Sequence, residues 1–127
     1  MATTTTSHKT AAQGFLKLAA SGDVRRAFSM YAGDGFRHHN PHFPGTADAL
    51  ITAMEDSARQ NPEKTIEFKR LLEEDDQVCV LSHVRMKPDD RGVAVVHIFR
   101  FEHDRIVELW DLAQPIPERL PNANGMF

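Results

Sequence analysis

The spacing of the hydrophobic residues in this 127-residue chain changes at Thr65. From Thr65 to Gln114 hydrophobic and polar residues alternate, which is the period of a β-strand with one buried face. Three short polar segments, at residues 74–76, 88–92 and 103–105, interrupt the alternation. Parallel neighbours need a crossover of a dozen residues or more, so connections this short predict an antiparallel meander. The predicted strands cover residues 65–73, 77–87, 93–102 and 106–114.

Before Thr65 the hydrophobic residues recur at helical spacing, which predicts three helices. The first runs from an N-cap at Ser7 to a C-terminal cap at Gly22, and the second from a cap at Asp23 to a point before Gly33. The third opens at residues 45–46 and ends before Asn61 and Pro62. A short extended segment at residues 36–41 separates the last two. Helices followed by such a sheet predict an α+β fold in which a curved antiparallel sheet closes over the helices. We expect one domain over residues 1–127, with residues 1–8 frayed and residues 115–127 as a tail.

Composition and charge exclude several classes of function. The chain has 15 Lys and Arg against 18 Asp and Glu, a formal charge of -3, which gives no electrostatic footprint for binding nucleic acid. Cys79 is the single cysteine, so neither an internal disulfide nor a cysteine-rich zinc site is possible. No stretch approaches the ~20 apolar residues that span a bilayer. We therefore expect a cytoplasmic protein that binds neither nucleic acid nor membrane.

Three polar residues stand on otherwise hydrophobic strand faces, and they are the candidate catalytic residues. Asp111 is the single charge in the set formed with Val107, Leu109 and Ala113, and His97 interrupts a similar set in the preceding strand. A carboxylate in such a place is either paired or kept partly protonated by desolvation, and both states suit acid/base chemistry. The predicted turns set His83 opposite His97 and His97 opposite Asp111. These side chains would then form one row across three strands.

Other interpretations of the same residues stay open. A single polar residue on a hydrophobic face is more often a core residue with its hydrogen bonds satisfied. In the strand at residues 77–87 the set opposite to His83 is the more hydrophobic, so His83 could face a partner subunit instead. The cluster at residues 38–42 is also typical of a solvated turn, and His8 and His103 carry no functional signal. His39, His83, His97 and Asp111 could form a metal site, but no metal-binding motif supports it, and we predict neither metal nor cofactor.

Three segments resemble one known family. Phe-Arg-His-His-Asn-Pro at residues 36–41 is similar to an aromatic-x-Gln-His-Asn-Pro motif, and residues 97–115 are similar to Asp-Ile-Phe-Arg followed by Lys-Ile-Val-Glu-His-Trp-Asp-x-x-Gln-Pro. The ending Asn-Ala-Asn-Gly-Met-Phe at residues 122–127 matches Asn-Thr-Asn-Gly-Met-Phe. On these motifs residues 15–127 resemble the SnoaL-like, polyketide cyclase-type branch of the nuclear transport factor 2-like superfamily. The chain departs from the pattern at three positions, with His38 for Gln, His97 for Asp and Leu109 for His.

The resemblance implies a cone-shaped sheet over the helices, a deep apolar pocket between the two, and a homodimer packed through the outer side of the sheet. It assigns an acid/base role to Asp111 and a place in the pocket lining to His39 and Asn40. Trp110 and Gln114, which match the Trp and Gln of the Trp-Asp-x-x-Gln-Pro motif, are further predicted substrate-binding residues. By residue type alone, however, Trp110 is more typical of the core.

The resulting hypothesis is a cofactor-free enzyme acting on a small apolar carbonyl compound. Asp111 would remove a proton alpha to the carbonyl, and protonated His97 or His83, with Asn40, would hydrogen-bond the developing enolate oxygen. The overall reaction would be an aldol condensation or cyclisation, an isomerisation or a dehydration. The alternatives are a non-catalytic small-ligand-binding or structural homodimer and a His/Asp metal-dependent site.

Overall fold

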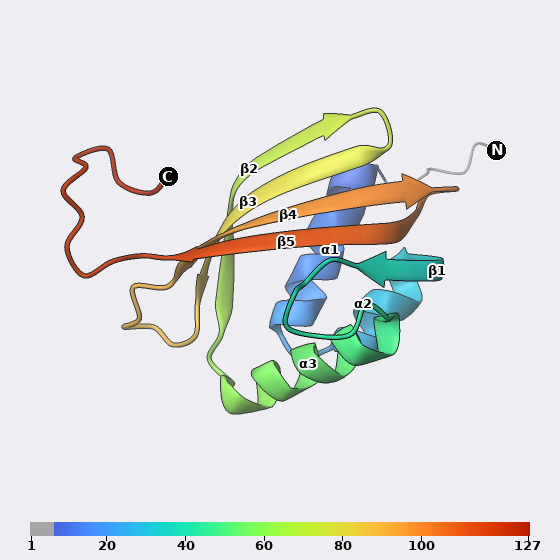
Figure 1. Cartoon of the computed structure of the whole chain (residues 1–127), viewed down its shortest axis with the longest axis horizontal. Helices are drawn as coiled ribbons and strands as arrows, with labels where there is room; N and C mark the ends of the chain where they lie inside the picture. Colours follow the sequence, from blue (N-terminus) through green and yellow to red (C-terminus); the bar gives the residue numbers. More distant parts are fainter. Residues whose placement is uncertain (1–6) are drawn as a thin grey trace.

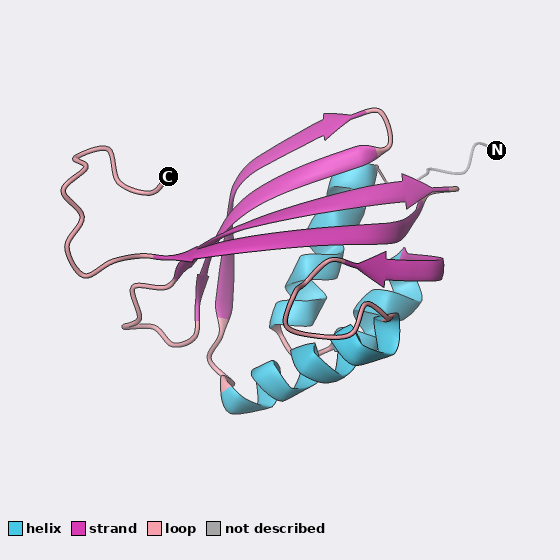
Figure 2. Ribbon diagram, viewed as in Figure 1, coloured by secondary structure: helices cyan, strands magenta, loops and turns pink. Residues whose placement is uncertain are grey.

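The computed structural model describes residues 7–127, which form three helices and five strands. In chain order these are α1 (His8–Ala20), α2 (Val24–Tyr31), β1 (Ala32–His38), α3 (Ala47–Gln60), β2 (Thr65–Glu74), β3 (Gln77–Arg85), β4 (Val93–Glu102) and β5 (Arg105–Pro115). The helices gather against one side of a curved sheet (Figure 2), which confirms the predicted α+β class. None of the helices in this described part has the length and hydrophobicity needed to cross a bilayer.

The helices begin where the capping residues predict. The side chain of Ser7 accepts a hydrogen bond from the Thr10 amide at the start of α1, and Thr46 caps α3 in the same way. Asp23 occupies the N-cap position of α2 but makes no capping hydrogen bond through its side chain. The predicted fraying is therefore wrong for residues 7 and 8, and residues 1–6 lie outside the described part.

His8 has a structural role that the sequence did not reveal. Its ring is stacked on Phe101, with centroids 4.1 Å apart, and its Nε2 lies 3.0 Å from Asp104 Oδ1. These contacts tie the start of α1 to the turn between β4 and β5.

The five strands form one mixed sheet in the order β1-β5-β4-β3-β2. The four strands from β2 to β5 make the predicted antiparallel meander, whereas β1 pairs with β5 in parallel, with His38 beside Leu109. Figure 1 shows β1 as a short strand at the edge of the long meander. The prediction of an entirely antiparallel sheet is wrong at this edge, because the argument from short connections covers only strands that follow one another in the chain.

The register between β4 and β5 places His97 opposite Asp111, as predicted. The turn is tighter than expected, because His103 and Asp104 form it alone with φ values of 50° and 63°, the left-handed pair typical of a two-residue hairpin. A bulge between Arg100 and Phe101 then shifts the pairing by one residue. The bulge compensates for the shorter turn, so the predicted pair is correct although the predicted turn is not.

The register between β3 and β4 differs from the prediction. Val84 pairs with Val93, which sets His83 opposite Ala94 and brings Val80 opposite His97. The strand ends early because the segment after Arg85 folds on itself, with Met86 donating its amide to Asp90 Oδ2 at 3.2 Å. The displacement is an odd number of residues, so it turns His83 to the opposite face of the sheet from His97.

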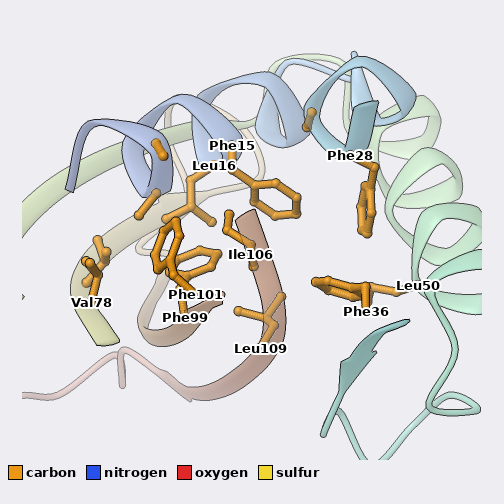
Figure 3. Packing of buried hydrophobic residues seen from close by; sticks show 14 of the residues in the cluster. Phe15, Leu16, Phe28, Phe36, Leu50, Val78, Phe99, Phe101, Ile106 and Leu109 are labelled. Atoms are coloured by element: carbon orange, nitrogen blue, oxygen red, sulfur yellow. The ribbon is translucent and has the colours of Figure 1, made fainter. Parts of the chain in front are cut away.

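The hydrophobic core lies between α1 and the face of the sheet that carries Val80, Phe99 and Leu109, which we call the inner face. Phe15 of α1 makes edge-to-face contacts with Phe28 and Phe99, at centroid distances of 5.0 and 5.7 Å (Figure 3). Burial then falls along the strands toward the β3–β4 loop. Phe99, Val80 and Leu109 are at most 1% exposed, as is Ser82, the next residue along β3. Farther along this face Val84 and Val95 are half-buried and Ala113 is exposed.

The position of Phe15 at the centre of the core predicts a large effect of its truncation. Phe15→Ala should lower the free energy of unfolding by about 3–5 kcal/mol, because it removes buried area and leaves a cavity. Phe43→Ala is the matched control, since Phe43 is 43% exposed, and it should change stability by less than about 0.5 kcal/mol. Urea unfolding of both variants measures the difference, and equal losses would contradict this assignment of the core.

Candidate functional site

His97 and Asp111 face each other on the inner face at the point where burial declines. They are direct partners across β4 and β5, and His97 is 9% exposed while Asp111 is half-buried. Val80, Phe99 and Leu109 surround the pair on the buried side. The pair therefore lies at the border between the hydrophobic core and the open end of the sheet.

Burial keeps the His97 ring neutral. Desolvation lowers the pKa of His97 to about 4, against a smaller upward effect of the Asp111 charge. Its Nδ1 is buried and has no hydrogen-bond partner among residues 7–127. A buried donor without a partner is rarer and costlier than a buried acceptor, so the surroundings favour the tautomer with its proton on Nε2. The predicted protonated His97 is thus corrected to a neutral imidazole that can still donate a hydrogen bond.

Ser82 is a second polar residue of the inner face, and we did not predict it as a site residue. Its Oγ is buried with no hydrogen-bond partner in the described part of the chain. Ser82 pairs with Val95 of β4, which lies two residues from His97. The available signal was its place as the single polar residue in the more hydrophobic set of β3, formed with Val78, Val80 and Val84.

Asn40 reaches Asp111 from the segment that follows β1. Asn40 Nδ2 donates to Asp111 Oδ2 at 3.1 Å, while Asn40 Oδ1 accepts the His42 amide at 2.9 Å. The structure therefore brings together three of the predicted site residues, Asn40, His97 and Asp111. Asp111 is paired with a neutral amide, since none of the ion pairs formed by residues 7–127 involves it.

An open depression of about 490 Å³ runs along the edge of β5 beyond β1, lined by residues 39–42 and 110–113. It exists because the pairing of β1 with β5 stops at His38 and Leu109, which leaves the following edge of β5 uncovered. Asn40 and Asp111 both line this depression. A ligand could therefore approach the carboxylate from this side. The deep apolar pocket implied by the family resemblance stays a prediction.

The other predicted residues lie on the opposite, outer face of the sheet. His39 stacks on Trp110, with centroids 4.8 Å apart, and His83 lies 2.8 Å from the Arg91 carbonyl oxygen through Nε2. Gln114 pairs with Ala94 on this face and is exposed. The four residues of the metal hypothesis are thus divided between two faces, and no group of three or more metal-ligating side chains is gathered within residues 7–127.

The outer face carries an ionic cluster that was not predicted from the sequence. Glu108 is 6% exposed and accepts hydrogen bonds from Arg37, Arg100 and His39, the last at 2.6 Å. These bonds, with that from Arg37 first, lower the pKa of Glu108 to about 2. In the sequence, Glu108 stands next to Leu109 and so belongs to the other face of its strand. The structure pairs it with Arg100 of β4.

Comparisons with known proteins agree with this architecture. The sequence profile of the SnoaL-like domain matches residues 12–109. The chain belongs to the SnoaL-like domain family. A search of curated protein sequences found no significant match.

Solved structures of several bacterial proteins share the fold of this SnoaL-like chain. An NTF2-like protein of unknown function from Cytophaga hutchinsonii has a TM-score of 0.71 at 16% identity and covers 91% of this chain and 96% of its own. A provisionally named polyketide cyclase from Bacillus cereus has a TM-score of 0.72 at 20% identity, and the match covers 84% of this chain and 74% of the cyclase chain. AclR of Streptomyces galilaeus, provisionally named a hydroxylase, has a TM-score of 0.71 at 16% identity, and the match covers 84% of this chain and 88% of the AclR chain. At these identities the likeness establishes the fold alone.

The lowered pKa of His97 predicts how stability depends on pH. Between its ordinary value of 6.5 and about 4, the unfolded chain binds a proton that the folded chain does not. Lowering the pH through this range should therefore reduce the free energy of unfolding by up to roughly 3 kcal/mol. The effect should be absent above pH 6.5 and missing from His97→Gln. Urea unfolding of both proteins at several pH values measures it, and equal slopes would contradict the prediction.

Proposed function

We propose that this SnoaL-like protein is a cofactor-free acid/base enzyme acting on a small, uncharged, largely apolar carbonyl compound. The observation that carries the proposal is the half-buried Asp111 carboxylate, held by Asn40 and set opposite a neutral His97. A base, a residue that orients it and an uncharged hydrogen-bond donor are the elements that proton abstraction next to a carbonyl requires.

The proposed step transfers one proton. The bond from Asn40 engages Oδ2 of Asp111, which leaves Oδ1 to take a proton from the carbon next to the substrate carbonyl. The electron pair of the broken C–H bond forms a carbon–carbon double bond, and the carbonyl oxygen takes the negative charge. His97 donates a hydrogen bond to that oxygen as a neutral imidazole. The enolate then attacks a second carbonyl, whose oxygen takes the proton from Asp111, takes the proton back at another carbon, or expels a hydroxyl group that leaves as water with that proton.

The charge of the site supports an uncharged substrate. Asp111 contributes a negative charge, no ion pair within residues 7–127 compensates it, and the nearby Ser82, His97 and Asn40 are neutral. A carboxylate or phosphate ligand would be repelled here. The provisional name of the Bacillus cereus structure, a polyketide cyclase, fits carbonyl chemistry of the same kind.

A deuterium-exchange assay tests this proposal without knowledge of the natural substrate. In D₂O the protein should accelerate exchange at the alpha position of at least one member of a panel of uncharged diketones and β-ketoesters, followed by proton NMR. Asp111→Asn should reduce the rate at least about 100-fold, because it removes the base.

The matched control is Asp89→Asn, which makes the same change at an exposed loop residue and should retain full activity. Full exchange activity in Asp111→Asn would overturn the assignment of the base. Absence of exchange across the panel, with ligands that nevertheless perturb the Asn40 and Asp111 signals, would favour a binding protein.

We also propose that the protein is a homodimer that packs through the outer face of the sheet. Leu72 and Leu112 are 64% and 65% exposed there, and half-buried Leu81, Val96 and Ile98 lie between them. An open depression of about 520 Å³ lies on this face against Leu81, Val96 and Leu112. A second, of about 630 Å³, extends from Leu72 and Ile98 to the polar turn between β2 and β3. An exposed apolar surface that joins several strands is typical of a protein interface.

A charge placed on this surface should separate the subunits. Leu112→Asp should convert the dimer to a monomer, because a desolvated carboxylate would lack a partner in the interface. Met30→Asp, at an exposed position of α2, is the control and should leave the mass unchanged. Sedimentation equilibrium measures the masses, and a monomeric wild-type protein at high concentration would contradict the proposal.

A further inference from the structure

We propose that His38 is a positioning residue that holds Asn40 in place against Asp111; this rests on the proposed function of Asp111 as the base. His38 ends β1 and is 5% exposed. Its side chain does not contact Asp111 in any hydrogen bond of the described residues, so it would act through Asn40 and not on the substrate.

Both ring nitrogens of His38 bond to the backbone of the segment at residues 39–45. Nε2 lies 2.7 Å from the Pro44 carbonyl oxygen, and Nδ1 accepts the Asn40 amide at 3.1 Å. A carbonyl oxygen can only accept and an amide N–H can only donate. The two bonds therefore specify one neutral tautomer of His38, with its proton on Nε2.

These bonds close the segment into a fixed loop. The His38 ring joins Asn40 near its beginning to Pro44 near its end, and the His38 amide donates to the Gly45 carbonyl at 3.3 Å. Residues 41–46 are exposed, so little hydrophobic burial is available to hold this loop. Its shape depends on hydrogen bonds, of which His38 makes three.

The loop in turn sets the direction of the Asn40 amide. Asn40 Oδ1 accepts the His42 amide, so the Nδ2 group is the one that points to Asp111. Rotating the amide by half a turn would place its oxygen against the carboxylate and lose both bonds. The connection thus runs from the His38 ring to the Asn40 backbone, and from the Asn40 side chain to Asp111.

The test compares His38→Phe with His38→Gln, and it reads out the Asn40 Nδ2 group by nitrogen NMR and the Asp111 carboxyl carbon shift at one fixed pH. His38→Phe keeps a ring but removes both bonds, so Asn40 should release Asp111 and the Asn40 Nδ2 protons should exchange with solvent roughly 5-fold faster. His38→Gln keeps a donor and an acceptor and should recover much of the wild-type exchange rate. A folded His38→Phe variant with unchanged Asn40 Nδ2 exchange and an unchanged Asp111 carboxyl shift would overturn the proposal.

His83→Phe is the matched control. It also removes a buried imidazole bonded to a loop carbonyl, but on the outer face, so it should cost stability without changing the Asn40 Nδ2 exchange or the Asp111 carboxyl shift. Should His38→Phe not fold, nitrogen NMR of the wild-type rings decides, because a proton on His38 Nδ1 would contradict the proposed bond from Asn40. None of these measurements needs turnover. The positioning role can therefore hold if deuterium exchange fails, and it can fail while Asp111 still acts as a base.

Discussion

The length of the strands relative to the helices shapes this molecule. A strand of ten residues such as β4 extends over about 33 Å, whereas a helix of 13 residues such as α1 extends over about 20 Å. The helices consequently bury one end of the inner face and leave the other end open, as the fall in burial along β3, β4 and β5 shows. His97 and Asp111 occupy the boundary, where polar groups can keep a route to solvent while still being partly desolvated.

The strand that carries Asp111 is held from both faces of the sheet by consecutive residues. His39 extends to the outer face, where it bonds Glu108 and stacks on Trp110, and Asn40 extends to the inner face, where it bonds Asp111. This follows from the alternation of side chains along an extended segment. The contacts of His39 on the outer face hold the edge of β5 in place, and the bond from Asn40 on the inner face orients the Asp111 carboxylate.

The sequence predicted local structure well, because its signals are local. Capping by Ser7 and Thr46, the period change at Thr65 and the turn residues located the elements to within a few residues. Strand pairings that depend on bulges and on the lengths of loops were predicted less reliably. The pair of His97 and Asp111 was correct because a bulge offset a short turn, whereas His83 was placed on the wrong face because the loop before Val93 is longer than its Pro88–Gly92 turn signal.

Contacts between distant parts of the chain were the least predictable. The parallel pairing of β1 with β5 decides which face His39 and Asn40 reach, and no local pattern encodes it. His38 looked like a member of a solvated turn because its bonds go to backbone atoms of the following loop, whose shape cannot be read from residue types. Buried groups that have no hydrogen-bond partner within the described residues, such as Ser82 Oγ, can be recognised only when the surrounding packing is known.

The two carboxylates of β5 show how environment assigns their roles. Glu108 accepts four hydrogen bonds, three of them from arginine, and its pKa near 2 means that it holds its charge and binds protons weakly. Among the hydrogen bonds of residues 7–127, Asp111 accepts one, from a neutral amide, and keeps free lone pairs beside a neutral imidazole. A base must have both an open lone pair and useful proton affinity. Of these two carboxylates, three residues apart on opposite faces of one strand, only Asp111 has the unoccupied lone pairs that this chemistry needs.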